Sequence, residues 1–177
     1  MFKKTIFVVA IATAATSALA EESAKEKRFS VGLASYATVI SDSTEDLDFS
    51  GFALFGTGAV NDNVGFRLTY AKQSWDDNSN LKLDALEGSL IAGTGLATIG
   101  FKAYGSLGFY SETLKANGAS EEIDFSGAMF GGGIGYNWSP VSLEFWINLR
   151  STDDYEEFAG GADVTAVSGG LGLSARF

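Results

Sequence analysis

The sequence predicts an all-β fold, an eight-stranded antiparallel up-and-down transmembrane β-barrel, on three observations. Eight segments alternate apolar residues with small or polar ones, which is the period of a strand with two different faces. The last segment, residues 167–177, keeps this alternation to its final residue, Phe177. Short turn-forming segments alternate with longer acidic ones between the strands, as in barrels whose hairpins cross a membrane.

The N-terminal segment predicts export. Lys3 and Lys4 precede an apolar run, and small residues follow it up to Ala20. We expect residues 1–20 to be a signal peptide, residues 21–27 a short periplasmic segment and residues 28–177 the outer-membrane barrel. A helical inner-membrane anchor is the alternative, but the apolar run is short for a hydrocarbon span of about 20 residues.

Alternation is most regular in residues 141–150, where every odd-numbered residue is apolar. Four other segments repeat it: 29–39, 64–73, 99–110 and 167–177. Three alternate less cleanly: 47–58, 81–92 and 123–136. In the last of these, the run from Gly131 to Gly133 suggests a β-bulge that exchanges the two faces of the strand.

The connections predict which end of the barrel faces outward. Three are tight turns built from turn-forming residues: 61–63, 93–97 and 137–140. The other four are mostly longer and carry most of the 22 acidic residues: 42–46, 74–80, 111–122 (with Glu112) and 151–162. Tight turns belong on the periplasmic side of such barrels and long loops on the outside, so we expect both termini in the periplasm.

Aromatic residues are expected in two girdles at the membrane surfaces. On the turn side these are Tyr136, Trp138 and Phe177, and on the loop side Phe49, Trp75, Phe125 and Tyr155. A secreted calyx with an apolar interior would show the same alternation. Glycines on the non-apolar face favour lipid on the outside: Gly100, Gly108, Gly170 and Gly172.

These features resemble the small eight-stranded outer-membrane proteins of Gram-negative bacteria, the family that includes OmpX, the transmembrane domain of OmpA and the opacity-porin-like barrels. The similarity covers residues 28–177 and includes the phrases at 61–70 (NDNVGFRLTY) and 132–136 (GGIGY). It implies that the barrel-assembly machinery reads the C-terminal aromatic residue, Phe177, with Ala175 and Leu173 in the same strand. It also implies outer-membrane lipid and lipopolysaccharide as partners.

The chemistry available to the chain argues against catalysis. It contains neither histidine nor cysteine, so the usual general base and the thiol nucleophile are both missing. We therefore expect no catalytic residues, no metal site, no cofactor and no enzyme activity. The net charge of −10 also argues against nucleic acid as a partner, because phosphate binding needs clustered cations.

The strand phases place charged residues inside the barrel. Arg67, Lys102 and Glu144 should point into the lumen at similar depth, and Glu87 should join them. Ions in so narrow a space must be paired, since a lone buried charge is costly. The lumen polar network that we predict is Arg67, Glu87, Lys102, Glu144, Arg150 and Arg176.

This network has two interpretations. The charged side chains either fill the barrel as a salt-bridge plug or exchange partners and open a thin ion path. Tyr36, Tyr104 and Trp146 should also point inward and narrow the lumen, so a wide porin is improbable. The acidic loops also have two interpretations, a solvated surface or a site for divalent cations or an extracellular partner. We therefore predict a non-enzymatic barrel with a structural or surface-interaction role, and keep a narrow, gated pore as the alternative.

Overall fold

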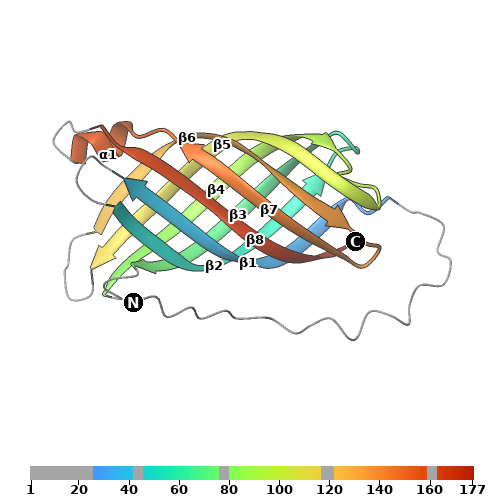
Figure 1. The fold of residues 1–177 in the computed structure, drawn as a ribbon, viewed down its shortest axis with the longest axis horizontal. Coiled ribbons are helices and arrows are strands. Elements are labelled where there is room, and N and C mark those ends of the chain that lie inside the picture. Colours follow the sequence, from blue (N-terminus) through green and yellow to red (C-terminus); the bar gives the residue numbers. More distant parts are fainter. Residues whose placement is uncertain (1–25, 42–45, 76–79, 117–121, 159–162) are drawn as a thin grey trace.

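The computed structural model describes residues 26–41, 46–75, 80–116, 122–158 and 163–177. The expected signal peptide and part of each expected outer loop lie outside these ranges. Eight strands close into a barrel in chain order (Figure 1). They are β1 (Phe29–Ser41), β2 (Asp46–Ala59), β3 (Val64–Trp75), β4 (Leu81–Thr94), β5 (Gly100–Ala116), β6 (Glu122–Asn137), β7 (Val141–Arg150) and β8 (Thr165–Arg176).

Each strand pairs antiparallel with the next, and β8 pairs with β1, which confirms the predicted fold. Following the pairing once around the barrel leads from Ser30 back to Ile40, a stagger of ten residues along β1. Such a stagger tilts the strands and sets a lumen just wide enough for side chains. None of the described residues forms a helix long and apolar enough to span a membrane.

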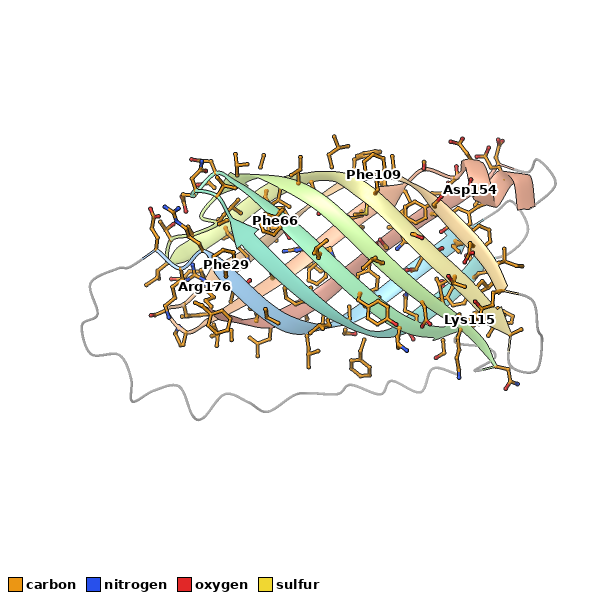
Figure 2. The ribbon with its side chains drawn as sticks, turned by 180° about the vertical axis from the view of Figure 1, so that it is seen from behind. Phe29, Phe66, Phe109, Lys115, Asp154 and Arg176 are labelled. Atoms are coloured by element: carbon orange, nitrogen blue, oxygen red, sulfur yellow. The ribbon has the colours of Figure 1, made fainter. Side chains whose placement is uncertain are left out.

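The barrel is apolar on the outside and polar within. Leu90, Leu107 and Phe109 expose about 66–73% of their surface on the outer face, whereas Arg67 and Glu144 are buried. Figure 2 shows apolar side chains radiating from the outer wall along most of its length. This is the reverse of a water-soluble calyx and is the distribution that a hydrocarbon environment requires.

The bulge predicted at Gly131–Gly133 is wrong. These residues pair without interruption with residues 104–106 of β5 and 146–148 of β7. The irregular pattern arises because the glycines carry no side chain to mark either face, and the inward phase continues unchanged from Phe125 to Asn137.

The strands on the loop side are longer than predicted. β5 continues to Ala116 and β6 begins at Glu122, so most of the expected loop 111–122 is strand. Lys115 lies at this end of the barrel (Figure 2). Its ammonium lies 3.7 Å from the Asp84 carboxylate and 3.5 Å from that of Glu122. The expected loop 151–162 contains a short helix, α1 (Asp153–Phe158).

The predicted loop-side aromatic girdle is wrong for three of its four residues. Phe49, Phe125 and Tyr155 are buried inside the barrel mouth rather than exposed to lipid. On the turn side, Tyr136 and Trp138 are exposed and pack together with ring centroids 4.8 Å apart. The girdle residues on that side therefore do lie on the outer surface.

Candidate functional site: the barrel lumen

Glycines and aromatic residues alternate around the middle of the lumen. One register row runs Tyr104, Gly133, Trp146, Gly170, Tyr36 from β5 to β1. A Cβ at Gly133 would overlap the Tyr104 hydroxyl, and one at Gly170 would lie 2.9 Å from the Trp146 ring. The glycines therefore provide the space that the neighbouring rings occupy.

Phe55 of β2 packs on Trp146 of this row with ring centroids 5.1 Å apart, and Tyr36 lies 6.2 Å from the same indole. All three side chains are fully buried. We call Tyr36, Phe55 and Trp146 the aromatic belt. This belt lies between two charged clusters, because its Trp146 ring contacts the Arg67 guanidinium and its Tyr36 hydroxyl donates to Glu87.

The turn-side cluster is centred on Glu144. Its Oε2 accepts hydrogen bonds from the Arg67 guanidinium and from the Tyr104 hydroxyl (3.1 Å), and it lies 3.1 Å from the Lys102 ammonium. Arg67 also donates to Tyr104 (2.6 Å) and stacks over the Trp146 ring at 4.6 Å. Two buried cations here share one carboxylate.

The loop-side cluster is centred on Arg150. Its guanidinium donates to Glu87 (2.6 Å) and to Glu112. Glu87 also accepts hydrogen bonds from the hydroxyls of Tyr36 (2.5 Å) and Ser168 (3.0 Å). Here one cation serves two carboxylates, so the two clusters carry opposite excess charge and together balance.

Helix α1 packs against β6 at the loop-side end of the barrel, and its Tyr155 side chain is buried there. Tyr155 stacks on Tyr110 with centroids 6.2 Å apart, packs on Phe125 at 4.7 Å, and donates its hydroxyl hydrogen bond to Glu112. Asp154 accepts a hydrogen bond from the Ser126 amide (2.8 Å), which fixes the helix to β6. Burial and then the nearby Glu112 raise the pKa of Tyr155, so its phenol remains a hydrogen-bond donor.

The structure rearranges the predicted lumen network. Arg67, Lys102 and Glu144 meet as expected, but Glu87 lies in the other cluster with Arg150. Arg176 joins neither cluster. It donates instead to backbone carbonyls at the turn-side end, including those of Trp138 (2.8 Å) and Ala97 (2.7 Å).

Glu112 is a charged lumen residue that the sequence did not predict, because the strand pattern assigned it to an outer loop. Its position could have been inferred by extending the inward phase of β5 from Gly108 through Tyr110. The outer face of this part of β5 turns polar, so the alternation that marks a strand disappears there while the strand continues.

The expected assembly residues lie on the outer face at the seam of the barrel. Phe177 is exposed, as are Leu173 and Ala175. The Phe177 amide donates to the Phe29 carbonyl (2.8 Å), and the Phe29 amide donates back (3.3 Å). These bonds extend the pairing of β8 with β1 to the end of the chain.

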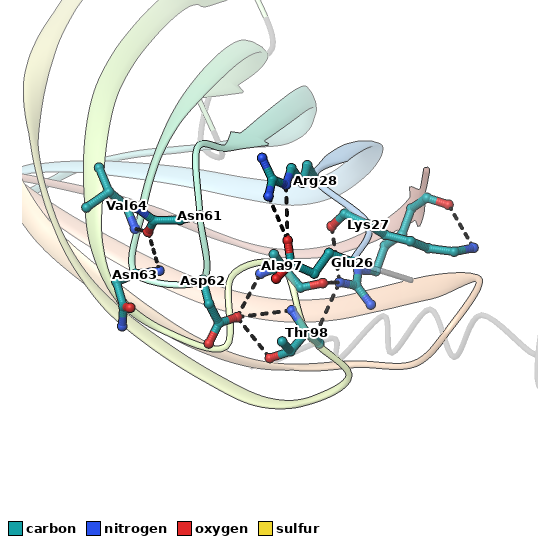
Figure 3. Close-up of polar contacts among 10 residues, drawn as sticks. Glu26, Lys27, Arg28, Asn61, Asp62, Asn63, Val64, Ala97 and Thr98 are labelled. Carbon is teal, nitrogen blue, oxygen red and sulfur yellow. Dashed lines mark hydrogen bonds and ion pairs between the residues drawn. The ribbon is translucent and has the colours of Figure 1, made fainter. Parts of the chain in front are cut away.

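Asp62 joins two of the turns (Figure 3). Its carboxylate, in the turn between β2 and β3, accepts hydrogen bonds from the Thr98 hydroxyl (2.9 Å) and from the amides of Gly95, Ala97 and Thr98 in the turn between β4 and β5. Desolvation raises the pKa of Asp62, but these bonds outweigh it and hold the pKa below its ordinary value. Nowhere among the described residues do three His, Cys, Asp or Glu side chains gather as metal ligands.

A closed barrel with an apolar exterior and a charged, filled lumen defines an integral membrane protein of the outer-membrane type. The chain belongs to the outer membrane protein beta-barrel domain family, whose model matches residues 6–177. This family places it in the outer membrane of Gram-negative bacteria. No curated protein matches the chain significantly.

Solved structures share this fold. Neisserial surface protein A is 16% identical with a TM-score of 0.59, over 88% of this chain and 98% of that one. Ail, the attachment invasion locus protein of Yersinia pestis, is 19% identical with a TM-score of 0.55, over 86% and 100%. The N-terminal barrel of Pseudomonas aeruginosa OprF is 14% identical with a TM-score of 0.56, over 86% and 100%. Identities this low establish the shared fold alone.

Proposed function

We propose that this protein is a non-enzymatic outer-membrane barrel with a structural or surface-interaction role, presented through acidic outer loops. The observation that carries the proposal is the filled lumen. The aromatic belt crosses it, each cluster pairs its ions, and Tyr155 occupies its loop-side mouth. A barrel so plugged is suited to presenting its exterior rather than to transporting bulky solutes.

We also propose where each segment of the chain lies relative to the outer membrane. Residues 1–20 act as the signal peptide, residues 21–27 lie in the periplasm with both termini, and the loop side faces outward among lipopolysaccharide. The barrel-assembly machinery recognises Phe177 with Ala175 and Leu173. The hydrogen bonds that seat Phe177 against β1 support a role for this residue in closing the barrel.

The charge of the outer rim suggests the chemistry of an outside partner. Ail has been solved in complex with the heparin analogue sucrose octasulfate, a polyanion. Exposed Asp46, Asp48 and Asp153 lie on the loop side of this chain, whose net charge is −10. Because like charges repel, we propose a basic rather than a polyanionic partner.

Adhesion of vesicles containing the protein to coated beads tests this role. We expect capture by polylysine-coated beads and not by heparin-coated beads, with capture weakening as salt rises. The variant Asp46→Asn/Asp48→Asn/Asp153→Asn should lose capture, while Glu26→Gln on the turn side should keep it. Equal capture by both coatings, or no effect of the triple variant, contradicts the proposal.

Identical lipid A mass profiles with and without the protein would support the absence of lipid-modifying activity.

The alternative function is a narrow, gated pore. The opposite excess charges of the two clusters support this alternative, because unevenly paired ions can exchange partners. Re-pairing of Arg67 and Lys102 around Glu144 could open a thin path beside the belt. Planar-bilayer recordings test it. Steady conductance that changes in Glu144→Gln or Lys102→Met supports the pore, and silence in the wild type and both variants removes it.

A further inference from the structure

A small cavity lies inside the turn-side end of the lumen, below the aromatic belt. Its volume is about 10 Å³, and it is lined from the buried Glu144 outward to the exposed Arg28 and Phe29. Tyr104 lines it, whereas Tyr36, Phe55 and Trp146 do not. A space of this size accommodates one water molecule.

Three polar atoms on the residues lining this cavity have no hydrogen-bond partner among the described residues. They are Asn137 Oδ1, Ser142 Oγ and Glu144 Oε1, and each residue is about 1% exposed. The Asn137 amide cannot be reversed without loss, because its Nδ2 already donates to the carbonyls of Gly95 (2.7 Å) and Thr98 (3.0 Å). Buried polar atoms without partners are costly, so a ligand that bonds to them is expected.

The donors and acceptors around the cavity select that ligand. Asn137 Oδ1 and Glu144 Oε1 accept hydrogen bonds, while the Ser142 hydroxyl and the Lys102 ammonium can donate them. A halide would face two acceptors, and a metal cation would face Arg67, Lys102 and Arg176, which all line the same cavity. Water donates two hydrogen bonds and accepts two, and therefore matches the set.

We propose that this end of the lumen is a hydrated port: it holds a buried water molecule bound by Asn137, Ser142 and Glu144. The port ends at Arg67, whose guanidinium stacks over Trp146 of the aromatic belt. Water thus reaches the turn-side cluster from the turn side, while the belt separates it from Arg150, Glu87 and Glu112. This inference goes beyond the proposed role and holds whether or not the lumen conducts.

Radiolytic footprinting tests the port, because hydroxyl radicals formed from a bound water oxidise the side chains beside it. The chain offers a natural matched pair, since Tyr104 lines the cavity and Tyr36 lies in the belt, and both are buried. Mass spectrometry of the folded, full barrel in vesicles should find Tyr104 oxidised several-fold faster than Tyr36. Equal rates for the two tyrosines would overturn the proposal.

A pair of variants localises the effect. Ser142→Val removes one partner of the water and fills its space, so Tyr104 oxidation should fall to the rate of Tyr36. Thr69→Val removes another buried, unpartnered hydroxyl that does not line the cavity, and it should leave Tyr104 oxidation unchanged. Unchanged oxidation in Ser142→Val overturns the site even if Tyr104 is reactive. If that variant fails to fold, the comparison of the two tyrosines in the wild type still decides.

Discussion

Single glycines decide which large side chains the lumen can hold. At Gly133 an added Cβ would overlap the Tyr104 hydroxyl and lie 2.8 Å from the Phe145 carbonyl oxygen. At Gly88, in the outward phase of β4, the nearest atom to an added Cβ is Leu68 Cδ2 at 3.5 Å, an ordinary contact. The cost of a methyl group therefore depends on which face of the strand the glycine occupies and on the side chain beside it.

Gly133→Ala should lower the free energy of unfolding by about 1–3 kcal/mol, the usual cost of overpacking. Gly88→Ala is its control and should be nearly neutral. Urea unfolding in lipid vesicles, followed by tryptophan fluorescence, measures both. Equal stability of the two variants would show that the Tyr104 side chain moves aside at little cost in free energy.

Among the described residues, Glu144 is the one carboxylate that pairs with Arg67 and Lys102. Glu144→Gln leaves two buried cations without a counter-charge, and we expect a loss of about 3 kcal/mol in the free energy of unfolding. Glu122→Gln, whose carboxylate is 59% exposed, should cost less than about 1 kcal/mol in the same assay. A loss for Glu144→Gln no larger than that of the control would contradict the paired cluster.

At this scale the sequence predicted that charged residues of the middle strands point inward, but it missed Glu112 and predicted only part of the pairing between them. Arg67, Lys102 and Glu144 could be grouped because each lies a few residues above a turn. The grouping of Glu87 with Arg150 depends on the pairing registers from β4 to β7, which set the height of each side chain along the barrel. No single strand contains that information.

Among the elements, the sequence predicted the strand segments that face hydrocarbon well. It predicted poorly the strand ends that extend beyond the hydrocarbon. On β5 the outward residues change from Leu107 and Phe109 to Ser111, Thr113 and Lys115, so the apolar mark of a strand ends before the strand does. Helix α1 was missed because it has only six residues and is held by contacts with the barrel mouth. Both failures arise from tertiary surroundings.

The two turns joined by Asp62 give a pH-dependent prediction. The pKa of Asp62 is lowered in the folded protein, so its stabilisation is present above the unfolded pKa of about 3.9 and is lost as the pH falls through the lower folded value. Asp62→Asn should lower the free energy of unfolding by about 1 kcal/mol at pH 7, and the difference should vanish in stronger acid. Melting temperatures across this range measure it, and a difference independent of pH would exclude the charge as its source.

For the whole molecule, closure of the barrel depends on the pairing of the last strand with the first. Deleting Phe177 removes the terminal pair of hydrogen bonds with Phe29 and an exposed aromatic side chain. We expect less inserted barrel while export continues. Electrophoresis before and after boiling measures the folded fraction, and cell fractionation measures export. An unchanged amount of the folded, heat-modifiable form in the outer membrane would contradict this prediction.

The orientation of the two faces governs every proposal about the lumen, and the absence of cysteine makes it directly testable with single labels. A fluorophore at Phe109→Cys or Phe145→Cys, which lie on the apolar outer face, should be quenched by brominated lipid and shielded from aqueous iodide. One at Asp153→Cys, exposed at the start of α1, should show the reverse. The physical reason is that the outer face can keep so many large apolar side chains uncovered only where no water reaches them. Iodide quenching at Phe109 and Phe145 comparable to that at Asp153 would place water on that face and reverse the assignment of wall and lumen.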